Sequence, residues 1–141
     1  MNTNLQTIIK QPSPAARIYK LKQNDILENA KKNRRIGIAL LDGIEIIKVS
    51  DILHCQSDGN YCKIHIRDGR IIVASRTLKN VETAISSNDF LRVHNSHLVN
   101  LSDVQKVMVD GIVLSCGVLL PVSRSRRSVL LDRISKMVAM V

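Results

Sequence analysis

Three short polar stretches carry the side chains of this sequence that could recognise another molecule. They are residues 58–63 (DGNYCK), 92–96 (RVHNS) and 123–127 (SRSRR). An asparagine amide can bond bidentately to the N6/N7 edge of adenine, and a guanidinium to the O6/N7 edge of guanine. Hydroxyl and amine groups suit phosphate oxygens. Each stretch falls at an expected strand end or loop, where binding residues concentrate, so the three together predict contacts with a nucleic acid.

The third stretch contains an energetic conflict. Its three arginines stand at the start of an expected helix, where the positive end of the helix dipole disfavours cations. The simpler interpretation is a helix start whose arginines are solvated. However, arginines at this position destabilise the helix, which favours a role for them in binding another molecule. For Asn95 taken alone, the simpler interpretation is an amide that stabilises its own loop.

The net charge indicates an anionic partner. The 141 residues hold 21 Lys and Arg against 12 Asp and Glu, a formal net charge of +9. Counted along the chain, residues 1–35 carry +6, residues 36–91 carry −1 and residues 92–141 carry +4. Such an excess in a small protein more often means nucleic acid than solubility alone. Aromatic residues make up only 2%, which disfavours single strands, because these need rings for base stacking.

Other classes of function lack support in the sequence. There is no Gly-rich phosphate loop, no H-E-x-x-H motif and no nucleophile–base–acid set, so we expect no enzyme. His94 and His97 lie three residues apart without a Cys-x-x-Cys pair, so we expect neither a metal nor another cofactor. No apolar run reaches the roughly 20 residues of a membrane helix. With no signal peptide either, we expect a cytoplasmic protein and no membrane partner.

The three cysteines are expected to be packing residues. If residues 57–60 form a four-residue turn, Cys55 and Cys62 face each other across a hairpin, and a disulfide becomes geometrically conceivable. A reducing cytosol argues against that bond, so redox sensing stays a secondary hypothesis.

Antiparallel strands are expected to position the polar stretches. Counting gives 17 Ile and 14 Val, and β-branched residues favour strands. Four of the six glycines follow an aspartate, a pair that suits tight hairpin turns. At the first such turn, Asp42 and Gly43, we expect Leu41 to pair with Ile44. The expected strands cover residues 36–41, 44–49, 52–55, 61–67, 70–76, 90–93, 104–109, 112–116 and 118–122.

Helices are expected in three places. One covers residues 21–33, one follows an N-cap at Thr77, and one follows residues 123–127. Before the first of these, Pro12 and Pro14 are expected to exclude regular structure.

Four segments, in this order, resemble the LytTR-type DNA-binding domain of bacterial transcriptional regulators. They are ILHCQSDGNY, SRTLKNVE, FLRVHNSHLVNL and LPVSRSRR, and the resemblance covers about residues 36–135. It implies antiparallel sheets with a small helix, and loops that enter successive major grooves of double-stranded DNA. It further implies paired direct-repeat promoter sites, for which we expect a homodimer on the DNA. Because residues 1–35 are too short for a receiver domain, we expect a response-regulator-like protein without one.

The resemblance also assigns residues by motif position. It implies that Asn95 is the loop asparagine, that Arg124 or Arg126 is the arginine of the last motif, and that residues 60–62 form the early turn. Asn95, Arg124 and Arg126 are then expected to read base edges. His94 either contacts phosphate or orients its loop. The side chains expected to hold phosphates are those of Lys63, Arg92, Ser123 and Arg127. The full set of expected DNA-contacting residues is Asn60, Tyr61, Cys62, Lys63, Arg92, His94, Asn95, Ser123, Arg124, Ser125, Arg126 and Arg127.

We therefore expect a basic N-terminal arm with a short helix over residues 1–35. A mostly β, elongated antiparallel LytTR-like DNA-binding domain with short helices is expected over residues 36–141. Its expected function is sequence-specific binding of double-stranded DNA in transcription regulation. The alternative is a basic β-domain that acts as a protein-interaction or structured-RNA-binding module.

Overall fold

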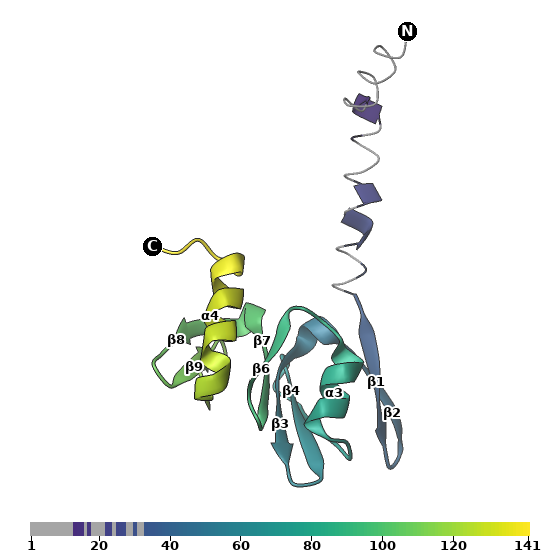
Figure 1. Cartoon of the computed structure of the whole chain (residues 1–141). Helices are drawn as coiled ribbons and strands as arrows, with labels where there is room; N and C mark the ends of the chain where they lie inside the picture. Colours follow the sequence, from purple (N-terminus) through teal and green to yellow (C-terminus); the bar gives the residue numbers. More distant parts are fainter. Residues whose placement is uncertain (1–12, 16, 18–21, 24, 28–29, 31–32) are drawn as a thin grey trace. The chain divides into compact units, whose positions relative to one another are not determined.

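The computed structural model describes residues 13–15, 17, 22–23, 25–27, 30 and 33–141 (Figure 1). The chain divides into two units, Met1–Arg34 and Arg35–Val141, each of which is considered by itself. No helix in the described part of the chain is long and apolar enough to cross a membrane.

The first unit is helical wherever it is described between Pro14 and Ala30. The expectation of irregular structure at Pro14 is therefore wrong, and the backbone N–H of Arg17 donates to the carbonyl of Ser13 at 3.1 Å. Proline is tolerated in a first helical turn, because its missing N–H has no partner there to lose. Pro12 lies outside the described residues.

A separate hairpin opens the second unit. It consists of β1 (Arg35–Leu40) and β2 (Gly43–Lys48). Leu40 lies opposite Gly43 and Ala39 opposite Ile44, so the expected pairing of Leu41 with Ile44 is wrong. Gly43 is the first residue of β2 and does not belong to the loop. It adopts φ +152°, a backbone conformation that glycine readily takes. Because the two registers differ by two residues, the same side chains still face the core.

Five antiparallel strands form the central sheet, in the order β5–β4–β3–β7–β6. Helix α3 (Leu78–Ile85) lies between this sheet and the β1–β2 hairpin (Figure 1). Its expected N-cap is confirmed, since the hydroxyl of Thr77 accepts the N–H of Asn80 at 3.1 Å. The strands are β3 (Ile52–Asp58), β4 (Tyr61–Ile66), β5 (Ile71–Ala74), β6 (Phe90–His94) and β7 (His97–Asn100). The core on the α3 side is built from Ile52, Cys55, Ile64, Val81, Ile85 and Leu98, among others.

A second core lies on the other side of the unit. Three short strands form a sheet in the order β10–β9–β8, and α4 (Arg124–Met137) follows them. The strands are β8 (Val104–Val107), β9 (Gly111–Leu114) and β10 (Leu119–Pro121). The apolar residues of this core include Val93, Val99, Leu101, Ile112, Leu114, Leu120 and Leu130. The last helix thus begins within residues 123–127 rather than after them, and its three arginines lie in its first turns.

The turn between β3 and β4 is shorter than expected. Asp58 pairs with Tyr61, so only two residues form the loop, and Gly59 supplies the left-handed conformation that it requires, at φ +59°. Cys62 then lies opposite Ser57 rather than opposite Cys55, and the two cysteines are diagonal neighbours. Both are buried free thiols. A hydrogen bond between them, followed by burial, raises the pKa of the Cys55 thiol.

Asp103 connects the two cores through its buried carboxylate. It lies in a short 3₁₀ turn (Leu101–Asp103) after β7. Arg67, from the β4–β5 turn, donates Nη1–H to Oδ1 at 2.7 Å and Nη2–H to Oδ2 at 2.9 Å. Ser115, from the β9–β10 turn, donates its hydroxyl to Oδ1 and its N–H to the Asp103 carbonyl. The hydrogen bond to Asp103 raises the pKa of Arg67 above its ordinary value.

The substitution Asp103→Asn should lower the free energy of unfolding by about 2 kcal/mol, because it leaves Arg67 without its counter-charge. Asp103 is only 5% exposed. The Arg67 side chain is 46% exposed, so water can solvate its charge in the variant and limits the loss. Urea denaturation followed by circular dichroism measures the loss. Asp68→Asn is the matched control, because the Asp68–Arg70 pair is exposed on both sides. Equal shifts in the two variants would contradict a bridging role for Asp103.

Candidate nucleic-acid interface

Backbone hydrogen bonds gather the three polar stretches at one end of the second unit. The N–H of Ser57 donates to the carbonyl of Ser96 at 2.9 Å, which joins the end of β3 to the β6–β7 turn. The N–H of Ser123 donates to the carbonyl of Val93 at 2.9 Å, which joins the start of α4 to the end of β6. The two hairpin ends and the first turn of α4 lie on the lower side of the unit in Figure 1.

The β6–β7 turn is held from both sides and presents Asn95. Arg92 donates Nη2–H to the Asn95 carbonyl at 2.6 Å. The N–H of Ser96 donates to Nδ1 of His94 at 3.1 Å. His94 therefore orients this turn, which is one of the two roles expected for it. The Asn95 side chain is exposed, so its amide points away from the scaffold that fixes its backbone.

The arginines of the last stretch differ in what their side chains do. Arg126 donates to the Arg92 carbonyl at 3.3 Å, and Arg127 donates to the Val109 carbonyl at 2.7 Å. Both are half-buried, and each braces a neighbouring segment. Arg124 is exposed, and its side chain makes no hydrogen bond or ion pair with any described residue. Its guanidinium is thus available to a partner.

Residues 123–127 also contain two serine hydroxyls. Ser123 is half-buried and Ser125 is exposed, and their Oγ atoms lie 3.5 Å apart. Residues 92–96 and 123–127 contain no carboxylate. Four arginines therefore create a local positive potential that no acidic residue of the same segments offsets, which favours an anionic ligand.

The β3–β4 hairpin contributes its tip but not all of its expected residues. Asn60 and Tyr61 are exposed, Tyr61 by 51%. Nζ of Lys63 lies 3.2 Å from Oδ2 of Asp58, an exposed ion pair of the kind that a phosphate can replace at little cost. The expectation that Cys62 contacts DNA is wrong in this structure. Its side chain is fully buried, because it alternates inward with Ile64.

A layer of histidines beneath the β6–β7 turn was not expected from the sequence. The rings of His54 and His65 stack with centroids 4.0 Å apart and planes 13° apart. The centroids of His94 and His97 are 5.5 Å apart. His54 and His97 are buried, and Nδ1 of each has no hydrogen-bond partner, nor does the buried Nε2 of His65. Only the pairing of β3 with β4 and β7 brings these residues together, so sequence spacing gives no signal for the layer.

Three of these histidines, His54, His65 and His97, are uncharged near neutral pH. Burial, and then the neighbouring His65 and His97, lower the pKa of His54 from 6.5 to about 4. Burial also lowers the pKa of His97, with His94 and His65 adding to it, and that of His65, with Lys63 adding to it. Within the described part of the chain, no group of three His, Cys, Asp or Glu side chains is placed to hold a metal ion. The layer therefore acts as neutral packing under the turn.

Comparisons with known proteins identify the family and the fold. Residues 42–135 match the family model described as the LytTr DNA-binding domain. A solved LytTr DNA-binding domain from Bacillus cereus superposes with a TM-score of 0.61 at 17% identity, over 71% of this chain and 95% of that one. At that identity the likeness shows the fold.

Two curated relatives are transcription or signalling proteins. The chain is 36% identical over 98 residues to the heme-containing CO-sensing transcriptional regulator RcoM 1 of Paraburkholderia xenovorans, which covers 65% of this chain and 36% of that protein. It is 24% identical over 116 residues to the sensory transduction protein LytT of Bacillus subtilis, which covers 76% and 48%. The chain spans less than half the length of both relatives.

Acidification should destabilise the second unit. The pKa of His54 is about 4 in the fold and 6.5 for a free histidine, so the unfolded state takes up a proton first as the pH falls. The free energy of unfolding should decrease from about pH 6.5 towards pH 4, by up to about 3 kcal/mol from this residue.

Denaturant titrations at a series of pH values measure this slope. His54→Phe keeps a ring in the stack and removes the titration, so its stability should change less between about pH 7 and pH 5. A slope as steep as that of the wild type would assign the acid sensitivity to other groups.

Proposed function

The chain belongs to the LytTr DNA-binding domain family, and on that premise we propose that it regulates transcription by reading a specific sequence in double-stranded DNA with loops. The observation that carries this proposal is the placement of Asn95 and Arg124. Both side chains are exposed. The backbone beside each is held to the end of β6: the Asn95 carbonyl accepts a hydrogen bond from Arg92, and the N–H of Ser123, next to Arg124, donates to the Val93 carbonyl.

Asn95 and Arg124 are the proposed base readers. An asparagine amide recognises adenine and a guanidinium recognises guanine in the major groove. Arg126 was expected to share this role, but its guanidinium already donates to the Arg92 carbonyl. We therefore assign to Arg126 the bracing of the β6–β7 turn, with its remaining N–H groups directed to phosphate.

Phosphate contacts are assigned to the residues that surround the two readers. Hydroxyl, amide, lysine and arginine groups hold a protein in register on the duplex but carry no sequence information. The ion pair of Lys63 with Asp58 is exposed on both sides, so Lys63 can exchange its partner for a phosphate. The proposed phosphate-contacting residues are Asn60, Tyr61, Lys63, Arg92, Ser123, Ser125 and Arg127.

The proposal also covers the DNA sites, the number of protein copies bound to them and the location in the cell. Paired direct-repeat promoter sites would be occupied by two copies of the chain, side by side or as a dimer. The regulator would then act where the chromosome lies, in the cytoplasm. No catalytic role is part of the proposal, because the described side chains at this end brace loops and offer donors. Domain bounds of 1–35 for the basic arm and 36–141 for the DNA-binding domain complete it.

Asn95→Ala and Arg124→Ala should each weaken binding to the cognate duplex by about 1–3 kcal/mol and leave binding to random duplex nearly unchanged. Selection of bound genomic fragments supplies the cognate site, and competition gel shifts give the ratio of the two affinities. Arg76→Ala is the matched control, because it removes the same charge from an exposed position outside the three stretches.

An unchanged affinity ratio in both reader variants would refute the assignment of Asn95 and Arg124. Competitors of double-stranded RNA and single-stranded DNA belong in the same assay. If structured RNA competed as well as the cognate duplex, the alternative of an RNA-binding module would replace the proposal.

The basic arm should add affinity without specificity. Residues 1–20 contain Lys10, Arg17 and Lys20 and no acidic residue. Replacing these three by Gln, or deleting residues 1–20, should flatten the slope of log affinity against log salt by about 0.9 for each phosphate that the arm no longer neutralises. Site preference should persist. The same slope in the wild type and both variants would remove the arm from the interface.

A further inference from the structure

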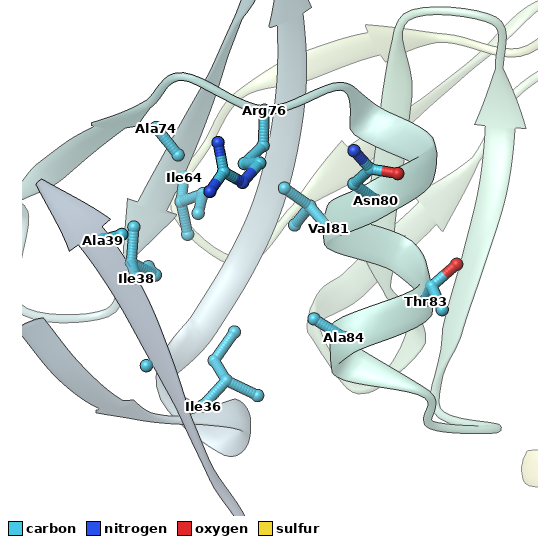
Figure 2. Close-up of a pocket in the computed structure, with 11 residues that line it drawn as sticks. Ile36, Ile38, Ala39, Ile64, Ala74, Arg76, Asn80, Val81, Thr83 and Ala84 are labelled. Carbon is cyan, nitrogen blue, oxygen red and sulfur yellow. The ribbon is translucent and has the colours of Figure 1, made fainter. Parts of the chain in front are cut away.

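A cavity away from the DNA-facing loops opens between β1 and α3 (Figure 2). Its volume is about 410 Å³, which lies within the range of small-molecule sites. None of the residues that line it belongs to the three polar stretches. The cavity therefore has no part in the proposed reading of DNA and needs an explanation of its own.

Small side chains keep this space open. Ala74 at the end of β5 and Ala84 on α3 add little bulk to the lining. Gly37 and Ala39 alternate along β1 with the inward Ile36 and Ile38, so they border the cavity without directing a side chain into it. The larger apolar side chains of the lining come from three elements: Ile36 and Ile38 on β1, Ile64 on β4 and Val81 on α3. These side chains belong to the core or pack against it, but the parts of their surfaces that face the cavity lack the dispersion contacts of a filled core. An apolar molecule of matching size would recover them.

Two of the three polar side chains of the lining, Arg76 and Asn80, lie towards one end, whereas Thr83 lies beside Ala84 and donates its hydroxyl to the Lys79 carbonyl. Figure 2 shows the guanidinium of Arg76 and the amide of Asn80 at the end near the β5–α3 connection, with Ile36 and Ala84 at the other. Of the eleven residues that line the cavity, Arg76 alone is charged. Its hydrogen bond runs to the carbonyl of the adjacent Ser75, at 3.0 Å, and no described carboxylate pairs with it.

We propose that this cavity binds a small apolar carboxylic acid. The hydrocarbon body lies between β1 and α3, and the carboxylate accepts hydrogen bonds from Arg76, whose planar fork fits two carboxylate oxygens. The Asn80 amide supplies a further donor. A single guanidinium balances the single charge of a carboxylate, whereas a wholly neutral ligand would leave the cation at the mouth of an apolar space unused. The inference rests on the cavity alone and not on the proposed function.

Titration of the full chain with octanoate, followed through the methyl signals of Ile36, Ile38 and Ala84, tests the proposal. These signals should shift saturably, and octanol, the matched neutral molecule, should bind about tenfold more weakly, because it lacks the charge-assisted bond. Arg76→Gln should reduce octanoate to the affinity of octanol. Ala84→Leu fills the cavity with a good helix former and should abolish the binding of both.

Arg124→Gln is the matched control, since it removes an arginine charge elsewhere and should leave octanoate binding unchanged. Arg76 is exposed, so Arg76→Gln keeps the fold and decides the question even if Ala84→Leu does not fold. Equal affinities for octanoate and octanol, unaltered binding by Arg76→Gln, or methyl shifts that never saturate would each overturn the proposal. Because no DNA is present in the titration, its failure is independent of any failure in DNA binding.

Discussion

A buried carboxylate needs a partner, and the partners of Asp103 come from both halves of the second unit. Arg67 belongs to the central sheet and Ser115 to the β9–β10 turn. A buried charge is strongly unfavourable unless it is paired and hydrogen-bonded. If these segments moved apart, the Asp103 carboxylate would lose its partners, so the pairing holds them together. Separate bonds, from the Ser123 N–H to the Val93 carbonyl and from Arg126 to the Arg92 carbonyl, hold the start of α4 against the end of β6.

Beneath that turn the protein uses histidines where most folds use aliphatic side chains. The His54 and His65 rings stack on each other and each has a buried nitrogen without a hydrogen-bond partner. Burial lowers the pKa of both. The flat rings of this layer pack between the central sheet and the second core. The arginine-rich surface above these rings is therefore strongly cationic, whereas the buried rings of His54, His65 and His97 beneath it are uncharged.

Local patterns predicted a large part of this fold. The strand expected over residues 61–67 is present as β4 (Tyr61–Ile66), and the expected N-cap at Thr77 accepts the N–H of Asn80. Turn registers were less predictable, because an Asp-Gly pair can stand inside a loop or begin the next strand. The bond of Arg126 to Arg92 spans 34 residues, and no local pattern distinguishes such a brace from a guanidinium that is available for DNA.

The arginines that brace this end all donate to backbone carbonyls rather than to carboxylates. A salt bridge would hold a loop equally well but would cancel the charge that attracts DNA. A carbonyl fixes the guanidinium and leaves its full positive charge. These arginines are thus preorganised and keep their charge, so less conformational entropy would be lost on binding an anionic partner. Rigidity and electrostatic attraction, which usually compete for the same arginines, are here supplied by one set of side chains.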